Sequence, residues 1–196
     1  NWNSYLFHSS FMNILAVSSL YIFLKNFNIQ KKYIIFYCIS FATLCYPVSG
    51  TPFAYIHAYI FSLISIMILI LAIKNRNKIV WFSLPFVCIL SFLSMQTPSA
   101  YILPIFFFII IYYFLKTRDY KNLNFFLLGC FFALFLFIIF MVITQTPFIN
   151  FLYQYILFPL TIGEGRLSSS ETAYVSFLDQ INIKRLIGDF KFIHIF

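Results

Sequence analysis

The side chain best placed for polar chemistry in this sequence is that of His57. It follows the uncharged turn 47–52 and lies near the beginning of a long apolar segment. In a membrane, an imidazole at this position could bond a hydroxyl or phosphate of a substrate, or only a neighbouring helix. His8 lies near the start of an earlier apolar segment and is interpreted as an interfacial residue, and His194 lies too near the end of the sequence to interpret. The pattern predicts His57 as a binding residue, with both roles open.

A second candidate site is the polar run 163–171, which reads Gly-Glu-Gly-Arg-Leu-Ser-Ser-Ser-Glu. Arg166 follows Gly163 and Gly165 and lies two residues after Glu164. A guanidinium binds phosphate through two parallel hydrogen bonds, and a flexible loop could fold such a group over a membrane-embedded ligand. A solvated surface charge explains the same residues equally well. Glu164 and Arg166 are therefore predicted as substrate-binding residues, with the surface alternative kept open.

Two further candidates belong to an uncharged turn. Gln-Thr-Pro occurs at 96–98 and again at 145–147, where proline ends or begins a helix because it lacks a backbone donor. Gln96 could bind a substrate or only form favourable turn chemistry at a membrane interface. Tyr101, next along the chain, could stack on a sugar or belong to the tyrosine belt usual at such interfaces.

Several kinds of catalytic chemistry have no counterpart in this sequence. It contains no P-loop glycine pattern, no HExxH and no GxSxG. The cysteines lie in apolar segments without a CxxC pair, so neither a metal site nor a disulfide framework is predicted: Cys38, Cys45, Cys88 and Cys130. The sequence contains few carboxylates, and none precedes residue 119: Asp119, Glu164, Glu171, Asp179 and Asp189. This scarcity weighs against an ion-driven transporter, which usually needs ionisable groups within the membrane.

The elements that would position these residues are apolar helices. Hydrophobic residues make up 62% of the chain and charged residues 9%, and the mean hydropathy is +0.92, whereas a soluble domain is about half apolar and a quarter charged. About 20 apolar residues span a bilayer as a helix. We predict an all-α, polytopic transmembrane helix bundle with about six spanning helices, at 8–24, 33–46, 53–73, 79–95, 99–115 and 123–143.

The loops between these segments alternate in charge, and this alternation predicts the topology. The basic residues gather in every second connection: Lys25, Lys31, Lys32, Lys74, Arg76, Lys78, Lys116, Arg118 and Lys121. The positive-inside rule places these loops in the cytoplasm and the uncharged turns outside, in a plasma (inner) membrane. The net charge of +8 is therefore interpreted as a topology signal, and no nucleic-acid partner is predicted.

The sequence divides into three parts on this interpretation. Residues 1–146 form the bundle, and 147–180 form an outer interfacial helix followed by the polar loop. Residues 181–196 mix charged and apolar side chains and lead toward a further helix. Because the chain begins at Asn1 rather than methionine, we interpret it as an internal fragment.

A family resemblance rests on Asn-Trp-Asn-Ser-Tyr at 1–5 before a helix, Tyr-Pro at 46–47, and Leu-Ser-Phe-Leu-Ser-Met-Gln-Thr at 90–97. This layout resembles the type C fold, polyprenyl-phosphate-sugar-dependent membrane glycosyltransferases, a group that includes protein mannosyltransferases and aminoarabinose transferases. The likeness covers residues 1 to about 166. It depends on the hydropathy pattern and on these short motifs.

The resemblance implies transfer of a sugar from a polyprenyl phosphate to an acceptor on the outer side. A carboxylate would act as general base, and basic groups would hold the departing phosphate. In the family the catalytic acid lies in the first outer loop, which would precede Asn1, so no catalytic residue is carried over. Many relatives place a lysine near the turn matched here by Met95, and this departure leaves Arg166 as the substitute. The cofactor is unknown, with a divalent cation in the full-length protein left open.

Two other classes of protein fit the same composition. An O-antigen polymerase or ligase-like enzyme would carry a long, arginine-rich outer loop. A transporter or non-enzymatic membrane subunit would need neither a carboxylate nor a phosphate site, and inverted repeats in the complete sequence would support it.

Overall fold

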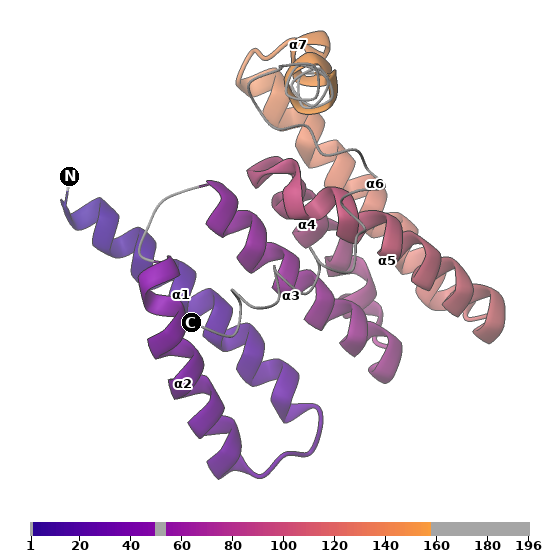
Figure 1. Cartoon of the computed structure of the whole chain (residues 1–196). Coiled ribbons are helices and arrows are strands. Elements are labelled where there is room, and N and C mark those ends of the chain that lie inside the picture. The colour runs from indigo at the N-terminus through magenta and orange to yellow at the C-terminus, as the bar shows by residue number, and fades with distance from the viewer. Residues whose placement is uncertain (1, 50–53, 158–196) are drawn as a thin grey trace, which may run out of the picture. The chain divides into compact units, whose positions relative to one another are not determined.

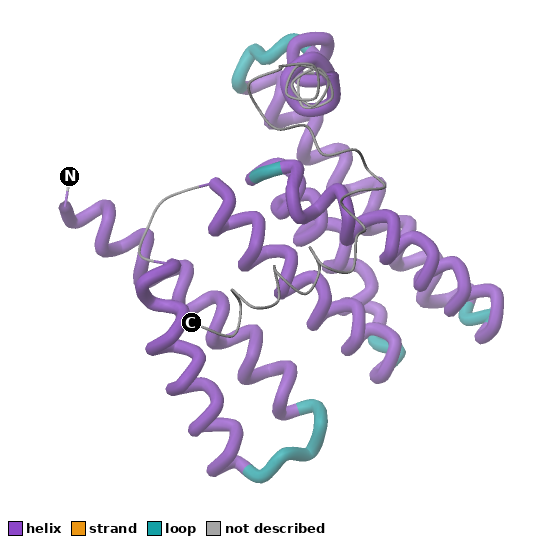
Figure 2. Tube along the Cα trace, viewed as in Figure 1, coloured by secondary structure: helices purple, strands orange, loops and turns teal. Residues whose placement is uncertain are grey.

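The computed structural model describes residues 2–49 and 54–157, and every regular element in those ranges is helical (Figures 1 and 2). The elements are α1 (Trp2–Lys25), α2 (Lys31–Ser49), α3 (Ala54–Asn75), α4 (Lys78–Ser94), α5 (Gln96–Thr117), α6 (Tyr120–Ile143), α7 (Phe148–Leu152) and the π-helical turn η1 (Tyr153–Leu157). The prediction of an all-α chain is confirmed. The chain divides into two units, Asn1–Phe140 and Met141–Phe196, which are described separately.

Each of the six predicted apolar segments forms one helix. Within the described ranges, four stretches are long and apolar enough to cross a membrane: Leu6–Lys25, Ala54–Asn75, Pro98–Thr117 and Tyr120–Ile143. The α4 helix is also apolar, but its 17 residues rise only about 26 Å, less than the roughly 30 Å of a hydrocarbon core. These four helices therefore support a membrane protein. That α2 and α4 also span the membrane stays a prediction.

The basic turns close with few residues because arginine adopts a left-handed backbone conformation there. Arg76 follows α3 with φ 49°, and Arg118 follows α5 with φ 52°. The Arg118 N–H donates to the carbonyl oxygen of Phe114 at 2.9 Å, which satisfies one of the last carbonyls of α5. Glycine usually occupies such a position because a Cβ atom makes it costly.

This strain predicts a difference between two variants that lose the same charge. Arg118→Gly is expected to be more stable than Arg118→Ala by about 1 kcal/mol, because only glycine adopts a positive φ without steric cost. Thermal unfolding in a mild detergent measures the difference. The reverse order is expected inside α5 at exposed Leu115, where glycine is the poorer helix former. Equal stability of the two Arg118 variants would contradict the strain.

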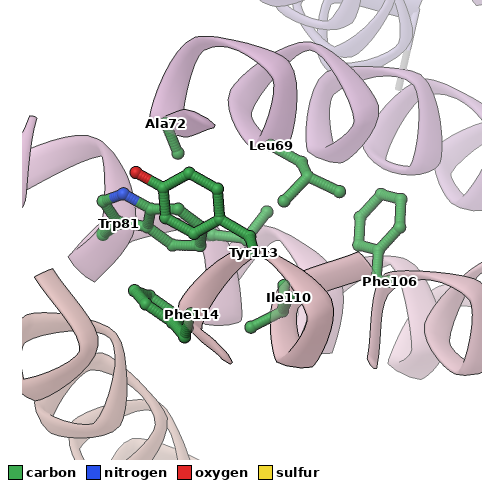
Figure 3. Packing of buried hydrophobic residues seen from close by; sticks show 8 residues of the cluster. Leu69, Ala72, Trp81, Phe106, Ile110, Tyr113 and Phe114 are labelled. Carbon is green, nitrogen blue, oxygen red and sulfur yellow. The ribbon is translucent and has the colours of Figure 1, made fainter. Parts of the chain in front are cut away.

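Buried aromatic rings hold α3, α4 and α5 together. Trp81 of α4 is 0% exposed, and its ring centroid lies 5.2 Å from that of Tyr113 and 4.8 Å from that of Phe114. Figure 3 shows these three rings gathered beside Leu69 and Ala72 of α3. Lipid is as apolar as these side chains, so close packing rather than exclusion of water favours the contact.

A second apolar cluster joins α1 to α3. It consists of two residues of α1 and three of α3, which follow one another at helical spacing: Met12, Ala16, Ile56, Ile60 and Ile64. The outer surface of the unit carries large exposed apolar side chains, among them Phe107, Phe131 and Leu134. Such a surface suits contact with lipid.

The described part of the second unit contains a short helix. Pro147 precedes α7, and the rings of Phe151 and Tyr155 stack with centroids 4.7 Å apart. None of the residues from Phe148 to Leu157 is buried. Residues 148–157 are helical, and the prediction that they form an outer helix on a membrane surface stays a prediction. The rest of that region, 158–180, and the predicted lead-in 181–196 lie outside the described residues.

Candidate functional site

Helices α1 and α3 run parallel, and polar contacts join them at both ends. At one end His8 hydrogen-bonds to His57, and at the other the Asn75 side chain donates to that of Asn26 at 2.7 Å. Both partners of the second contact lie 18 residues after those of the first, which corresponds to about 27 Å along a helix. This separation is close to the thickness of a hydrocarbon core. The two contacts therefore define two polar ends of an apolar bundle.

The histidine pair lies at the end where α1 and α3 begin. The two Nε2 atoms are 2.6 Å apart, and the ring centroids lie 4.8 Å apart with the planes at 78°. One Nε2 must donate and the other accept, so at least one ring is neutral. The pair can hold one extra proton at most. A ligand would thus meet a donor and an acceptor rather than two positive charges.

Two buried polar atoms in this turn of α1 lack a partner, one on His8 and one on the residue that follows it. In the described structure, Nδ1 of His8 and the hydroxyl of Ser9 are buried and have no hydrogen-bond partner. A buried polar atom without a partner costs about 1–3 kcal/mol, so such atoms often mark a place where a ligand or water binds. His57 is half-buried and bonds a neighbouring helix, one of the two roles that the sequence left open. The structure adds His8, which the sequence indicated only as an interfacial residue.

The other predicted site residues are placed differently. Gln96 is the first residue of α5 and is half-buried, and Tyr101, one turn further, is 70% exposed. No hydrogen bond or ring contact in the described residues joins either of them to His57. Glu164 and Arg166 lie outside the described residues.

Three buried serines connect the start of α5 to the start of α3. The hydroxyl oxygens of Ser62 and Ser99 each lie 2.6 Å from that of Ser91, and Ser91 donates to the carbonyl oxygen of Ala58 at 3.0 Å. Because Ala58 follows His57, the beginnings of α3 and α5 lie at the same end of the unit. Sequence reasoning missed this serine cluster. The sequence feature that could have indicated it is the presence of small polar residues within apolar helices, because such residues commonly lie at helix contacts in membranes.

The opposite end collects the basic connections. Lys74 donates to the carbonyl oxygen of Asn26 at 2.5 Å, and Asn122 of α6 donates to that of Arg76 at 3.0 Å. The first hydrogen bond joins the end of α3 to the loop after α1, and the second joins the start of α6 to the loop after α3. Within the described residues, the bundle therefore has one basic end and one uncharged end. The alternation of basic and uncharged loops in the sequence predicted this arrangement.

The described residues offer little for a metal or a catalytic carboxylate. No group of three or more His, Cys, Asp or Glu side chains within them could hold a metal ion. Asp119 is the one carboxylate in 2–49 and 54–157, and it accepts hydrogen bonds from Asn122 at the start of α6. The uncharged end thus offers imidazole and hydroxyl groups for binding.

Comparison with known proteins identifies no relative: no family model, no curated protein and no solved structure matches this chain.

Proposed function

We propose that this chain is the membrane-embedded part of a glycosyltransferase that uses a polyprenyl-phosphate sugar at the extracytoplasmic side of the plasma (inner) membrane. In this proposal the basic loops lie in the cytoplasm, and the His8–His57 end lies near the outer surface. The proposal combines the family resemblance with one structural observation, the half-buried imidazole pair at the uncharged end. An O-antigen polymerase or ligase-like enzyme, a transporter and a non-enzymatic subunit are the competing classes.

The pair suits the phosphate of a lipid-linked sugar. An N–H group donates to a non-bridging phosphate oxygen, and charge-assisted bonds of this kind are about twice as strong as neutral ones. A proton shared between the two Nε2 atoms would offset the charge that develops on the departing lipid phosphate. The adjoining Ser9 hydroxyl can add a donor.

Among the described residues, no carboxylate of the kind that the reaction needs lies at this end. Asp119 lies at the basic end, where it bonds the start of α6. The resemblance places the general base in an outer loop that would precede Asn1. The role proposed for the described residues is therefore to bind the donor phosphate, with Gln96, Tyr101, Glu164 and Arg166 as further candidate contacts.

Alanine substitution of the pair tests the proposal in the complete protein. His8→Ala and His57→Ala are each expected to lower kcat/KM for a polyprenyl-phosphate sugar about tenfold or more, because a hydrogen bond to a charged group contributes about 1.5–3 kcal/mol. The double variant is expected to lose little more than either single variant, since the two rings act as one unit. Transfer is measured in membrane vesicles at matched amounts of protein.

Tyr59→Ala is the matched control, because Tyr59 is exposed two residues after His57 on the same helix. We expect it to transfer sugar at the unsubstituted rate. Arg166→Ala is expected to lower transfer without lowering the amount of protein in the membrane. Unchanged transfer in both histidine variants would remove the pair from the site.

A further inference from the structure

The beginnings of α4 and α6 come together at the basic end. The Asn122 side chain reaches from α6 to the carbonyl oxygen of Arg76, in the turn before α4. Asn77 caps α4 by accepting from the Ile79 N–H at 2.9 Å, and Asp119 accepts from the Asn122 N–H at 3.3 Å. Each helix start presents backbone N–H groups and a partial positive charge. Two such starts therefore lie side by side.

Cationic side chains gather over these helix starts. The ammonium of Lys78 lies 5.2 Å from the ring centroid of Phe125 on α6. Phe125 is four residues after Lys121, so the two occupy the same face of that helix. Lys78 thus lies along the face that carries Lys121, and the neighbouring Lys121 ammonium lowers the pKa of Lys78 from its ordinary value. Arg76 is exposed in the adjoining turn.

The three cations Arg76, Lys78 and Lys121 outnumber the carboxylates that the described residues place at this end. Asp119, their one carboxylate, has both oxygens engaged by Asn122. Holding ammonium groups close together is unfavourable unless an anion lies between or beside them. A phosphate would interact with the cations and with both helix starts at once.

Apolar surface adjoins the cations directly. Ile79, which follows Lys78, is 75% exposed, and Leu128 on α6 is exposed about two turns after Lys121. A ligand that fits both features has a phosphate head and hydrocarbon chains. Clusters of basic residues at the end of membrane helices are the usual binding sites for anionic lipid headgroups.

We propose that Arg76, Lys78 and Lys121, at the joined starts of α4 and α6, bind the phosphate headgroup of an anionic phospholipid. The acyl chains would lie on the exposed apolar side chains beside them. This site lies at the opposite end of α3 from the histidine pair and does not depend on the proposed sugar transfer.

Titration of the purified chain in a neutral detergent tests the lipid site. Phosphatidylglycerol is added, with phosphatidylcholine in a parallel series, and Trp81 fluorescence is followed in a Trp2→Phe background. Trp81 is a suitable reporter because it lies one turn after Lys78 and packs against Phe126 with ring centroids 6.0 Å apart. We expect phosphatidylglycerol to change the emission at concentrations at least tenfold lower than phosphatidylcholine.

Paired substitutions separate a defined site from general surface charge. The double variant Lys78→Gln with Lys121→Gln is expected to weaken phosphatidylglycerol binding about tenfold to thirtyfold, because each basic residue near an anionic lipid surface contributes about 1 kcal/mol. Lys31→Gln with Lys32→Gln removes the same charge from the start of α2 and is expected to leave binding within about twofold. Lys78→Arg with Lys121→Arg keeps the charge and should keep the binding.

Three outcomes would overturn the proposal. The first is equal weakening in the two glutamine double variants, and the second is the absence of any preference for phosphatidylglycerol. The third is equal binding of inorganic phosphate and phosphatidylglycerol, which would make the ligand a free anion.

Discussion

Replacing Gly129 with alanine is expected to lower the free energy of unfolding by about 1–3 kcal/mol, because α6 touches the backbone of α4 at this residue. A Cβ atom on Gly129 would lie 2.3 Å from the carbonyl oxygen of Phe82 and 3.1 Å from its Cα. These are backbone atoms, so relief requires one helix to move away from the other. Small residues allow such close approach between membrane helices.

The same displacement would separate aromatic rings that pack between α4 and α6. Phe132 of α6 lies with its ring centroid 6.2 Å from Phe82 and 5.9 Å from Phe86. Gly129→Leu is therefore expected to cost more than Gly129→Ala, because it forces the helices further apart. Unfolding by denaturant in detergent, followed by Trp81 fluorescence, measures both variants.

Leu128→Ala is the matched control for this prediction. Leu128 is the neighbour of Gly129 in sequence, and its side chain is 53% exposed. Its replacement is expected to change stability by less than about 0.5 kcal/mol, as is usual for surface positions. If Gly129→Ala were as stable as Leu128→Ala, α4 and α6 would not approach as closely as described.

Replacing Ser91 with alanine is expected to cost about 2 kcal/mol, since it removes the central hydroxyl of the serine cluster. Ser91 accepts from Ser62 and Ser99 while it donates to the carbonyl oxygen of Ala58. All three serine side chains are buried. The alanine leaves the Ser62 hydroxyl without an acceptor and leaves Ser99 only the Met95 carbonyl oxygen at 3.5 Å, so the cost exceeds that of one lost hydrogen bond.

A triple variant distinguishes this explanation from simple loss of packing. Changing Ser62, Ser91 and Ser99 together to alanine leaves no unpaired hydroxyl, so we expect it to be less destabilised than the sum of the three single variants. Ser94→Ala serves as the control, because that hydroxyl bonds only the Leu90 carbonyl of its own helix and is exposed. Additive losses in the triple variant would contradict a shared network.

The local sequence is enough to predict that the chain is helical and where each helix lies along it. The predicted segment 123–143 corresponds to α6, Tyr120–Ile143, and the segment 99–115 to α5, Gln96–Thr117. Long apolar runs that end at charges or prolines determine helix positions through nearby residues alone. The alternation of basic and uncharged loops also follows locally, because consecutive helices that cross the same layer must alternate in direction.

The contacts that make up the candidate sites could not be predicted in this way. Helices α3 and α6 are apolar on all sides, so their sequences show no preferred packing face. The pairing of His8 with His57 depends on α1 lying beside α3, 49 residues further along the chain. The meeting of Lys78 with the Lys121 face, and of Gly129 with Phe82, depends in the same way on α4 lying beside α6.

The sequence by itself therefore determined an all-helical, strongly apolar chain with its charges gathered in alternate connections. Only the tertiary structure decided which polar residues meet, because those contacts join helices distant in sequence and arise from packing between neighbours. In a bundle whose helices are apolar all round, a few glycine, serine and histidine residues at helix contacts select the neighbours, through close approach and interhelical hydrogen bonds.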